Sequence, residues 1–324
     1  MRILVTGGAG FIGSHFVRHI VKNPEHSVIV LDAMTYAANA SNLTDVWDSI
    51  EFLHGDIRSY ETVDYAMSRC DLVVHFAAES HVDRSLENAQ PFAHTNVVGT
   101  QMLVDAAVRH DIHRFVHVST DEVYGSIREG SWTEESPLAP RSPYAATKAA
   151  SDLVVLAARH THGLDTVITR GSNTYGPHQY PEKLIPRFAT ALLRGRKAPL
   201  YGTGVNVRDW LHVEDHVMGI SQAMDHGDPG EVYNLGGMEE HTNIEVTDII
   251  LRTLQLGWEN VEFVPDRQGH DYRYSLDSSK ANSALHWNNI TERREFHRAI
   301  PETVRWYRDN RSWWEPTFME GVHA

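Results

Sequence analysis

Short apolar runs, rich in β-branched residues, recur along the first half of the chain and alternate with longer amphipathic stretches. The runs are residues 3–5, 28–31, 72–76, 115–118 and 166–168. Runs of this kind are typical of parallel strands that are buried on both faces. The stretches between most of them, such as 91–110 and 142–161, are long enough for crossover helices. Strand alternating with helix predicts an α/β fold with a doubly wound parallel sheet.

The pattern changes after about residue 170, where prolines punctuate the chain and short strands mix with helices. We therefore expect a smaller, mixed α/β lobe that is interleaved with the last parts of the sheet domain. The predicted division gives residues 1–174 to the sheet domain and residues 175–205 and 238–324 to the smaller lobe. Residues 206–237 are expected to return to the sheet domain.

A glycine-rich turn follows the first predicted strand and opens a helical stretch. Gly7, Gly10 and Gly13 satisfy the pattern G-x-x-G-x-x-G. Such glycines let the backbone approach a pyrophosphate, which then sits at the helix N-terminus. Asp32 ends the second predicted strand, where an acid accepts a hydrogen bond from a ribose 2′-hydroxyl and repels a 2′-phosphate. Together these residues predict a Rossmann-type domain that binds NAD rather than NADP.

Tyr144 and Lys148 stand four residues apart in the predicted helix 142–161, so they share one face of it. An ammonium there would favour the phenolate and lower the Tyr144 pKa. The result is a base that takes the proton from an alcohol or sugar hydroxyl while hydride leaves its carbon. Asp121 and Glu122, directly after a predicted strand, add two carboxyl groups that a simple alcohol oxidation does not need. A second step that uses an acid and a base is therefore expected, with a raised pKa at Asp121, unless the pair is only a solvated loop.

Composition narrows the classes of function. The chain has 324 residues and a net charge of −14, which argues against a nucleic-acid-binding protein. Cys70 is the only cysteine, so no intrachain disulfide is possible, as expected for a cytoplasmic protein. No stretch approaches 18 uninterrupted apolar residues, so no membrane span is predicted. The 21 histidines are scattered and show no metal-binding spacing, so no metal is predicted, and His75 is expected to be a satisfied core residue.

Several longer strings carry a resemblance to a known family. They are residues 77–85, 119–125, 182–186 and 269–274, beside the glycine turn, the Tyr144 and Lys148 pair and Arg208-Asp209-Trp210. With these strings the chain resembles the extended short-chain dehydrogenases/reductases that act on nucleotide sugars. Among them it is similar to the dTDP-glucose 4,6-dehydratases, in the form found in deoxysugar pathways of actinomycete secondary metabolism. The similarity runs nearly end to end, as far as residues 304–307.

The resemblance implies a role for each matching residue. Thr120, Tyr144 and Lys148 would form the oxidation triad, with Asp121 as general acid and Glu122 as general base of a dehydration. The implied contacts to NAD are Gly7, Gly10, Phe11, Ile12, Gly13, Asp32, Thr35, Asp56, Ile57, Ala77, Ala78, Ser80, Thr95, Tyr144 and Lys148. The implied contacts to the nucleotide sugar are Ser80, Thr120, Asn173, Lys183, Leu184, Pro199, Tyr201, Arg208, Asn243, Arg267, His270 and Tyr274. From the sequence alone, Asp56 could equally be an ordinary turn residue.

The chain departs from the family pattern in two places. Thr174 stands where many relatives carry an Asn, and Ala33-Met34 replaces a common Lys-Leu pair, so polar cofactor contacts are in question at both. The implied activity is the conversion of dTDP-D-glucose to dTDP-4-keto-6-deoxy-D-glucose and water, which makes the protein a lyase.

Other functions and the assembly state are left open by the sequence. The alternatives are a UDP- or GDP-sugar dehydratase, a nucleotide-sugar 4-epimerase, against which Asp121 and Glu122 argue, and a silent NAD-sensing protein, against which the intact catalytic set argues. Family members pair as homodimers through a four-helix bundle. The stretches 91–110 and 142–161 are candidates for it, although their apolar faces could equally be core.

Overall fold

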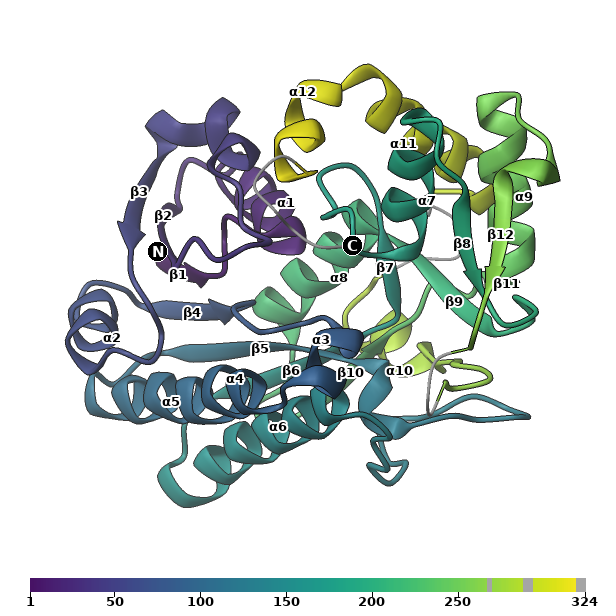
Figure 1. Ribbon diagram of the computed structural model, residues 1–324. Helices are drawn as coiled ribbons and strands as arrows, with labels where there is room; N and C mark the ends of the chain where they lie inside the picture. Colours follow the sequence, from purple (N-terminus) through teal and green to yellow (C-terminus); the bar gives the residue numbers. More distant parts are fainter. Residues whose placement is uncertain (267–269, 288–293, 319–324) are drawn as a thin grey trace.

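Seven parallel strands form the centre of the computed structural model, which describes residues 1–266, 270–287 and 294–318. Their order across the sheet is β10-β6-β5-β4-β1-β2-β3, and all neighbours run parallel (Figure 1). The bounds are β1 (Arg2–Thr6), β2 (Ser27–Asp32), β3 (Ile50–His54), β4 (Leu72–His75), β5 (Arg114–Thr120), β6 (Thr166–Gly171) and β10 (Val232–Leu235). The predicted doubly wound parallel sheet is confirmed.

Side chains that alternate along each strand fill two apolar layers, one on each face of the sheet. On β1, Ile3 and Val5 pack into one layer, whereas Leu4 packs into the other. Figure 1 shows α1 and α8 over one face and α5 and α6 side by side over the opposite face. The bounds of the helices over the first face are α1 (Phe11–Ile20), α8 (Val213–His226) and α10 (Ser279–Ala284), and those over the second are α2 (Tyr60–Met67), α5 (Thr100–Arg109) and α6 (Pro143–His162).

The two predicted crossover helices are present, but the first is divided. The stretch 91–110 consists of α4 (Gln90–Phe92), a π-helical segment η2 (Ala93–Gly99) and α5. The stretch 142–161 is the single helix α6, which Ser142 caps by accepting a hydrogen bond from the backbone N–H of Ala145 at 3.1 Å. Shorter helical pieces in this half of the chain are η1 (Ala40–Ser49), α3 (Val82–Glu87) and η3 (Asp121–Tyr124). Within the described residues, no helix is long and apolar enough to cross a membrane.

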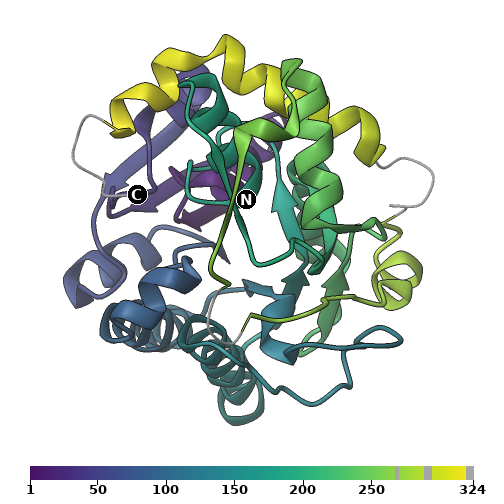
Figure 2. The ribbon, with the colours of Figure 1, turned by 45° about the vertical axis from the view of Figure 1, so that its right-hand side comes forward.

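A third apolar cluster, besides the two layers on the sheet, is built mainly by the C-terminal helices. Ile250, Val304 and Trp314 are among its fully buried residues. In Figure 2 the yellow helices at the end of the chain lie across the top of the molecule, next to the green α9. The bounds in this region are β7 (Asn173–Tyr175), α7 (Leu184–Leu193), β8 (Ala198–Tyr201), β9 (Val207–His212), β11 (Glu240–Thr242), α9 (Asn243–Leu254), η4 (Trp258–Asn260), β12 (Val261–Val264), α11 (Phe296–Asp309), α12 (Arg311–Trp314) and η5 (Glu315–Phe318).

Residues 206–237, expected to return to the sheet domain, behave in two ways. β10 joins the main sheet beside β6, as the sequence suggested. β9 instead lies between β7 and β11 in a separate three-stranded sheet, where each of its two edges is hydrogen-bonded to one of these short strands. The helix α8 that follows β9 packs back on the main sheet. The division into two domains remains a prediction.

A half-buried histidine, His178, lies between α1 and the C-terminal helices. Its ring centroid lies 5.6 Å from that of His15 on α1, 4.6 Å from that of Trp306 and 5.6 Å from that of Trp313. Burial lowers the His178 pKa to about 3, and it lowers the His15 pKa to about 4. His178 has φ +65°, a left-handed conformation that Asn tolerates better than most residues.

We predict that His178→Asn makes stability less dependent on pH. A histidine with a depressed folded pKa takes up a proton only on unfolding between about pH 6.5 and its folded pKa, so it destabilises the fold as the pH falls through that window. The urea unfolding free energy should therefore drop between pH 7.5 and 5.5 by about 1 kcal/mol less in the variant than in the wild type. His160→Asn, at an exposed position, is the matched control and should behave as wild type. Equal drops in both variants would contradict the prediction.

Candidate active site

A cavity of about 460 Å³ opens at the carboxyl ends of the parallel strands and extends to the C-terminal lobe. It falls in the size range of small-molecule sites, at the edge where doubly wound sheets bind ligands. The predicted site residues that line it are Gly7, Gly10, Phe11, Ile12, Gly13, Asp32, Thr35, Asp56, Ile57, Ala77, Ala78, Ser80, Thr95, Thr120, Asp121, Glu122, Tyr144, Lys148, Asn173, Lys183, Leu184, Pro199, Tyr201, Arg208, Asn243, His270 and Tyr274. Arg267 lies outside the described residues. One cavity thus brings together groups from distant parts of the sequence.

The glycine turn forms the floor of one end of this cavity. Gly7 has φ +71°, and a Cβ atom on Gly13 would lie 2.2 Å from the Gly7 carbonyl oxygen. Helix α1 begins directly after Gly10, and no side chain among the described residues caps its first turn. The N–H groups at its start are therefore available to an anionic ligand.

Asp32 is held rigidly at the end of β2. Its Oδ2 accepts a hydrogen bond from the Ala9 N–H at 2.9 Å, and its Oδ1 accepts one from the Met34 N–H at 2.8 Å. Burial raises the Asp32 pKa, and the two backbone hydrogen bonds act against this shift. A carboxyl group fixed in this way suits a ribose hydroxyl and excludes a phosphate.

Asp56 also lines the cavity, but it is already paired. The Arg58 Nη2 lies 2.6 Å from the Asp56 Oδ2, and this hydrogen bond lowers the Asp56 pKa. Ile57 is buried beside it and packs in the apolar layer under α2 and α5. Whether Asp56 contacts an adenine remains a prediction.

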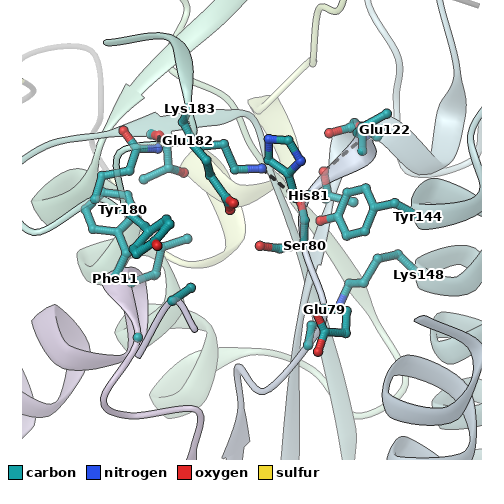
Figure 3. Close-up of a pocket in the computed structure, with 18 of the residues that line it drawn as sticks. Phe11, Glu79, Ser80, His81, Glu122, Tyr144, Lys148, Tyr180, Glu182 and Lys183 are labelled. Atoms are coloured by element: carbon teal, nitrogen blue, oxygen red, sulfur yellow. Dashed lines mark hydrogen bonds between the residues drawn. The ribbon is translucent and has the colours of Figure 1, made fainter. Parts of the chain in front are cut away.

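The candidate catalytic residues face one another at the centre of the cavity. Thr120 ends β5, Glu122 lies in η3, and Tyr144 and Lys148 lie one turn apart on α6. Figure 3 shows the side chains of Tyr144 and Glu122 close together, with Lys148 further along the same helix. The Lys148 Nζ donates a hydrogen bond to the Val118 carbonyl oxygen at 2.8 Å.

Asp121 lies deeper than Glu122 and is almost inaccessible, with 3% of its surface exposed. Its Oδ1 accepts a hydrogen bond from the Thr120 hydroxyl at 3.2 Å, whereas its buried Oδ2 has no hydrogen-bond partner among the described residues. Burial raises the Asp121 pKa well above its usual range, and the charges of Glu122 and Asp209 raise it further. The predicted raised pKa is confirmed, and a carboxyl group of this kind can act as an acid at neutral pH.

Two cations at the other end of the cavity are fixed by backbone carbonyl groups. The Lys183 Nζ donates to the Ser80 carbonyl oxygen at 2.8 Å (Figure 3). The Arg208 Nη2 donates to the Asp271 carbonyl oxygen at 2.9 Å. Bonds to neutral carbonyl groups orient both cations without cancelling their charge, which suits an anionic ligand.

Comparison with known proteins agrees with this geometry. A family model described as GDP-mannose 4,6 dehydratase matches residues 4–300. The dTDP-glucose 4,6-dehydratase of Streptomyces antibioticus is 52% identical, over 98% of this chain and 95% of its own. The chain belongs to the dTDP-glucose 4,6-dehydratase family.

Solved structures place the chain within the wider superfamily. DesIV, a dTDP-glucose 4,6-dehydratase from Streptomyces venezuelae solved with NAD bound, superposes with a TM-score of 0.95 and 53% identity, and the match covers 98% of this chain and 100% of DesIV. A UDP-glucose 4-epimerase from Thermotoga maritima superposes with a TM-score of 0.88 and 29% identity over 95% and 99% of the two chains. The dehydratases and the epimerases therefore share the fold, and the residues of the site must separate them.

One electrostatic prediction for this family member is wrong. Lys148 was expected to lower the Tyr144 pKa, but burial and then the charges of Glu122 and Asp121 raise it above its usual range. The Lys148 amine is directed to the Val118 carbonyl group, and burial lowers its own pKa to about 8. The ionised form of Tyr144 is therefore disfavoured, and positive charge brought into the cavity by a ligand would act against this effect.

Sequence reasoning missed a bridge between the two ends of the cavity. The Tyr36 hydroxyl donates to the Glu182 carboxylate at 3.1 Å, and the Arg84 guanidinium lies 3.6 Å from the centroid of the Tyr36 ring. We name these three residues the Tyr36 bridge. It connects the loop after β2 with the segment that carries Lys183. Glu182 lies in one of the strings that carry the resemblance, but nothing in the sequence points to Tyr36 as its partner.

The departure at residue 174 has a structural explanation. The Thr174 hydroxyl lies 2.7 Å from the His216 Nδ1 and donates to the Ser172 carbonyl oxygen at 3.1 Å. Both Thr174 and His216 line the cavity. The hydroxyl is therefore occupied by the protein itself, whereas the longer Asn of relatives could reach further. Of the second departure, Ala33 lines the cavity and Met34 packs against the apolar layer of α1 and α8.

We predict that Asp121 is protonated in the resting protein. Infrared spectra at pH 7 should contain a protonated carboxyl band that is absent from Asp121→Asn, because burial and two neighbouring carboxylates disfavour the charged form. Glu122→Gln is the matched control and should retain the band. A wild-type-minus-Asp121→Asn difference that shows only an ionised carboxylate would contradict the prediction.

Proposed function

We propose that this protein is an NAD-dependent hydro-lyase that converts dTDP-D-glucose to dTDP-4-keto-6-deoxy-D-glucose and water. The observation that carries the proposal is that Asp121 and Glu122 line the same cavity as Tyr144 and the glycine turn. Oxidation of a sugar alcohol needs a base such as Tyr144 and a cofactor bound at the glycine turn. Elimination of water needs an acid and a base, for which Asp121 and Glu122 are present. The full-length similarity to dTDP-glucose 4,6-dehydratases gives the substrate.

The residues present fit NAD. The glycine turn leaves room for a pyrophosphate at the start of α1, and Asp32 stands where a ribose hydroxyl would lie. NAD bound there would supply the hydride acceptor for the sugar C4 and the hydride donor for C6, so that the reaction would have no net oxidation. The remaining predicted cofactor contacts surround this space.

Tyr144 is the base of the first stage. It takes the proton of the sugar 4-hydroxyl, while Thr120 and Lys148 complete the triad. The hydrogen bond between the Thr120 and Tyr144 side chains lowers the Tyr144 pKa against the effect of burial. The product of this stage is a 4-ketone, which acidifies the hydrogen on C5.

Asp121 and Glu122 carry the second stage. Glu122 removes the C5 proton, and Asp121 gives its proton to the departing 6-hydroxyl, so water is lost across C5 and C6. The protonated state of Asp121 follows from its burial, and the greater exposure of Glu122 suits a base. Reprotonation at C5 completes the product.

The other end of the cavity is proposed to hold the nucleotide. Lys183 and Arg208 are placed for the pyrophosphate, and Arg267 is proposed to join them. The Oδ1 atoms of Asn173 and Asn243 are buried and have no partner among the described residues, so they can accept hydrogen bonds from the ligand. Leu184, Pro199, Tyr201, His270 and Tyr274 complete the lining.

A label at C4 tests the whole reaction. With dTDP-glucose deuterated at C4, the product should be lighter by one water, carry the deuterium at C6 and carry a solvent hydrogen at C5. Mixed labelled and unlabelled substrate should show little crossover. Tyr144→Phe is the control and should lower turnover by about 10²–10⁴-fold.

Each failed outcome of the label experiment has its own meaning. Deuterium kept at C4 would indicate an epimerase, and deuterium lost to released NADH would indicate a net dehydrogenase. Faster turnover of UDP-glucose or GDP-mannose in parallel assays would move the substrate assignment to another nucleotide sugar.

We further propose a cytoplasmic homodimer. Cys70 is a free thiol, as suits a reducing compartment. η2 and α6 pack against each other, and each leaves an apolar side chain exposed, Val98 at 49% and Leu153 at 58%. Pairing α6 and the continuous helical segment of η2 and α5 with the same elements of a second copy would cover both side chains in a four-helix bundle.

We predict that Leu153→Glu makes the protein monomeric, because it places a charge in the proposed apolar contact. Light scattering should report twice the monomer mass for the wild type and the monomer mass for the variant. Met218→Glu, an exposed apolar position on α8, is the matched control and should remain dimeric. A monomeric wild type would contradict the proposal.

A further inference from the structure

A buried ionic group lies beneath the catalytic residues and is not explained by substrate or cofactor binding. It consists of Asp152 on α6, Arg170 on β6, Tyr124 in η3 and Asn234 on β10, and none of the four lines the cavity. Arg170 stands between Ser119 and Asn234 in the register of β5, β6 and β10. The group therefore links the adjacent strands β6 and β10 to α6 and η3.

The contacts within the group form one continuous chain. The Arg170 Nε donates to the Asp152 Oδ2 at 2.9 Å, and its Nη1 donates to the Tyr124 hydroxyl at 2.7 Å. The Tyr124 hydroxyl donates in turn to the Asn234 Oδ1 at 2.8 Å. Asp152 is fully buried and Arg170 is 3% exposed. Charges so far from water persist only when they are paired and hydrogen-bonded.

One end of this chain stands beside Lys148. Asp152 follows Lys148 by one helical turn on α6, so their side chains lie on the same face. Burial lowers the Lys148 pKa to about 8, and the Asp152 charge acts in the opposite direction. Among the described groups, Asp152 is the one whose charge raises this pKa.

The other ionisable groups near Lys148 do not supply the negative charge that Asp152 supplies. His75 on β4 and His117 on β5 both feel the Lys148 charge, and burial lowers the pKa of each, that of His117 to about 4. Both rings are therefore neutral at pH 7. Tyr144 lies on the same helix, and Asp121 is kept protonated by burial. The nearest charged partner of Asp152 is Arg170, which is hydrogen-bonded to it.

The other end of the chain fixes the turn that carries the acid and the base. η3 runs from Asp121 to Tyr124, and the Thr120 hydroxyl caps its start by accepting from the Glu122 N–H at 3.3 Å. Its end is held by the Tyr124 hydroxyl through Arg170 and Asn234. Both ends of this single turn are therefore tied to the sheet.

We propose that Asp152 and Arg170 form a positioning pair for the two catalytic stages, with Asp152 supplying the counter-charge for Lys148 and Arg170 fixing, through Tyr124, the turn of Asp121 and Glu122. The inference rests on the proposed function and adds residues that touch neither ligand. A buried ion pair of this kind is weak evidence for stability, since a well-packed apolar pair often does as well. Because the pair lies between Lys148 and η3, we assign it a role in positioning these two parts of the site rather than in stability.

Asp152→Asn tests the first half of the proposal. The variant keeps the shape and an acceptor for Arg170 but removes the negative charge, so Lys148 loses its proton at lower pH. In single-turnover experiments read by NADH absorbance, the alkaline fall of the C4 oxidation rate should move down by about one pH unit or more. Asp309→Asn, an exposed carboxylate on α11, is the matched control and should keep the wild-type profile. A slower oxidation with an unchanged profile would overturn this half, because it would indicate packing alone.

Tyr124→Phe tests the second half and keeps the ring in place. Oxidation should proceed at the wild-type rate, whereas the NADH formed should persist about tenfold longer, because a loosened turn misplaces the acid and the base. Decay of NADH at the wild-type rate would overturn the role of Arg170. If Asp152→Asn does not fold, wild-type decay of NADH in Tyr124→Phe still overturns the proposal, because the pair would then not serve both stages.

The two readouts separate this inference from the proposed function. The mass of the wild-type product decides whether water is lost at all. The pH profile concerns only the C4 oxidation, which an epimerase would also carry out. The experiment with Asp152→Asn therefore still tests the role of Asp152 if no water is eliminated.

Discussion

Removing ionisable groups from water is the constraint on which this site depends. Asp121, Lys148 and Asp152 are all almost fully buried at the carboxyl edge of the sheet, where the cost of a charge is set by its neighbours rather than by solvent. Asp121 has two carboxylates near it, so it stays neutral. Asp152 has a guanidinium in contact, so it stays charged. The same type of side chain thus takes opposite charge states at two buried positions, which places an acid in the cavity and a fixed negative charge outside its lining.

The sheet makes these environments possible. Its two faces are covered by helices, and its parallel register places Arg170 on β6 beside Ser119 on β5 and Asn234 on β10. The C-terminal lobe closes the cavity from the other side with Arg208 and Asn243. The candidate catalytic residues therefore come from regular elements or their ends, β5, η3 and α6, rather than from long loops.

Much of this could be predicted because local patterns carry it. Buried parallel strands are continuous apolar runs, and a glycine turn followed by an acid at the end of the next strand can be recognised without knowledge of the rest of the fold. The candidate site residues other than Arg267 gather in one cavity, although their individual roles remain predictions. Local patterns do not show which distant parts of the chain become neighbours in the fold. The pairing of β9 with β7, the reversed effect on the Tyr144 pKa and the link from Asp152 to Tyr124 all depend on such neighbours.

The Tyr36 bridge has a consequence for the supply of reducing equivalents. It ties the loop beside Asp32 to the segment that holds Lys183, so the wall on the cofactor side and the wall on the sugar side do not separate without breaking it. In the proposed reaction the cofactor is reduced at C4 and reoxidised at C6 of the same sugar. Flux through the protein then follows the amount of sugar nucleotide and is independent of the ratio of NAD to NADH in the surroundings. The pathway step is thereby insulated from the redox state of the cell.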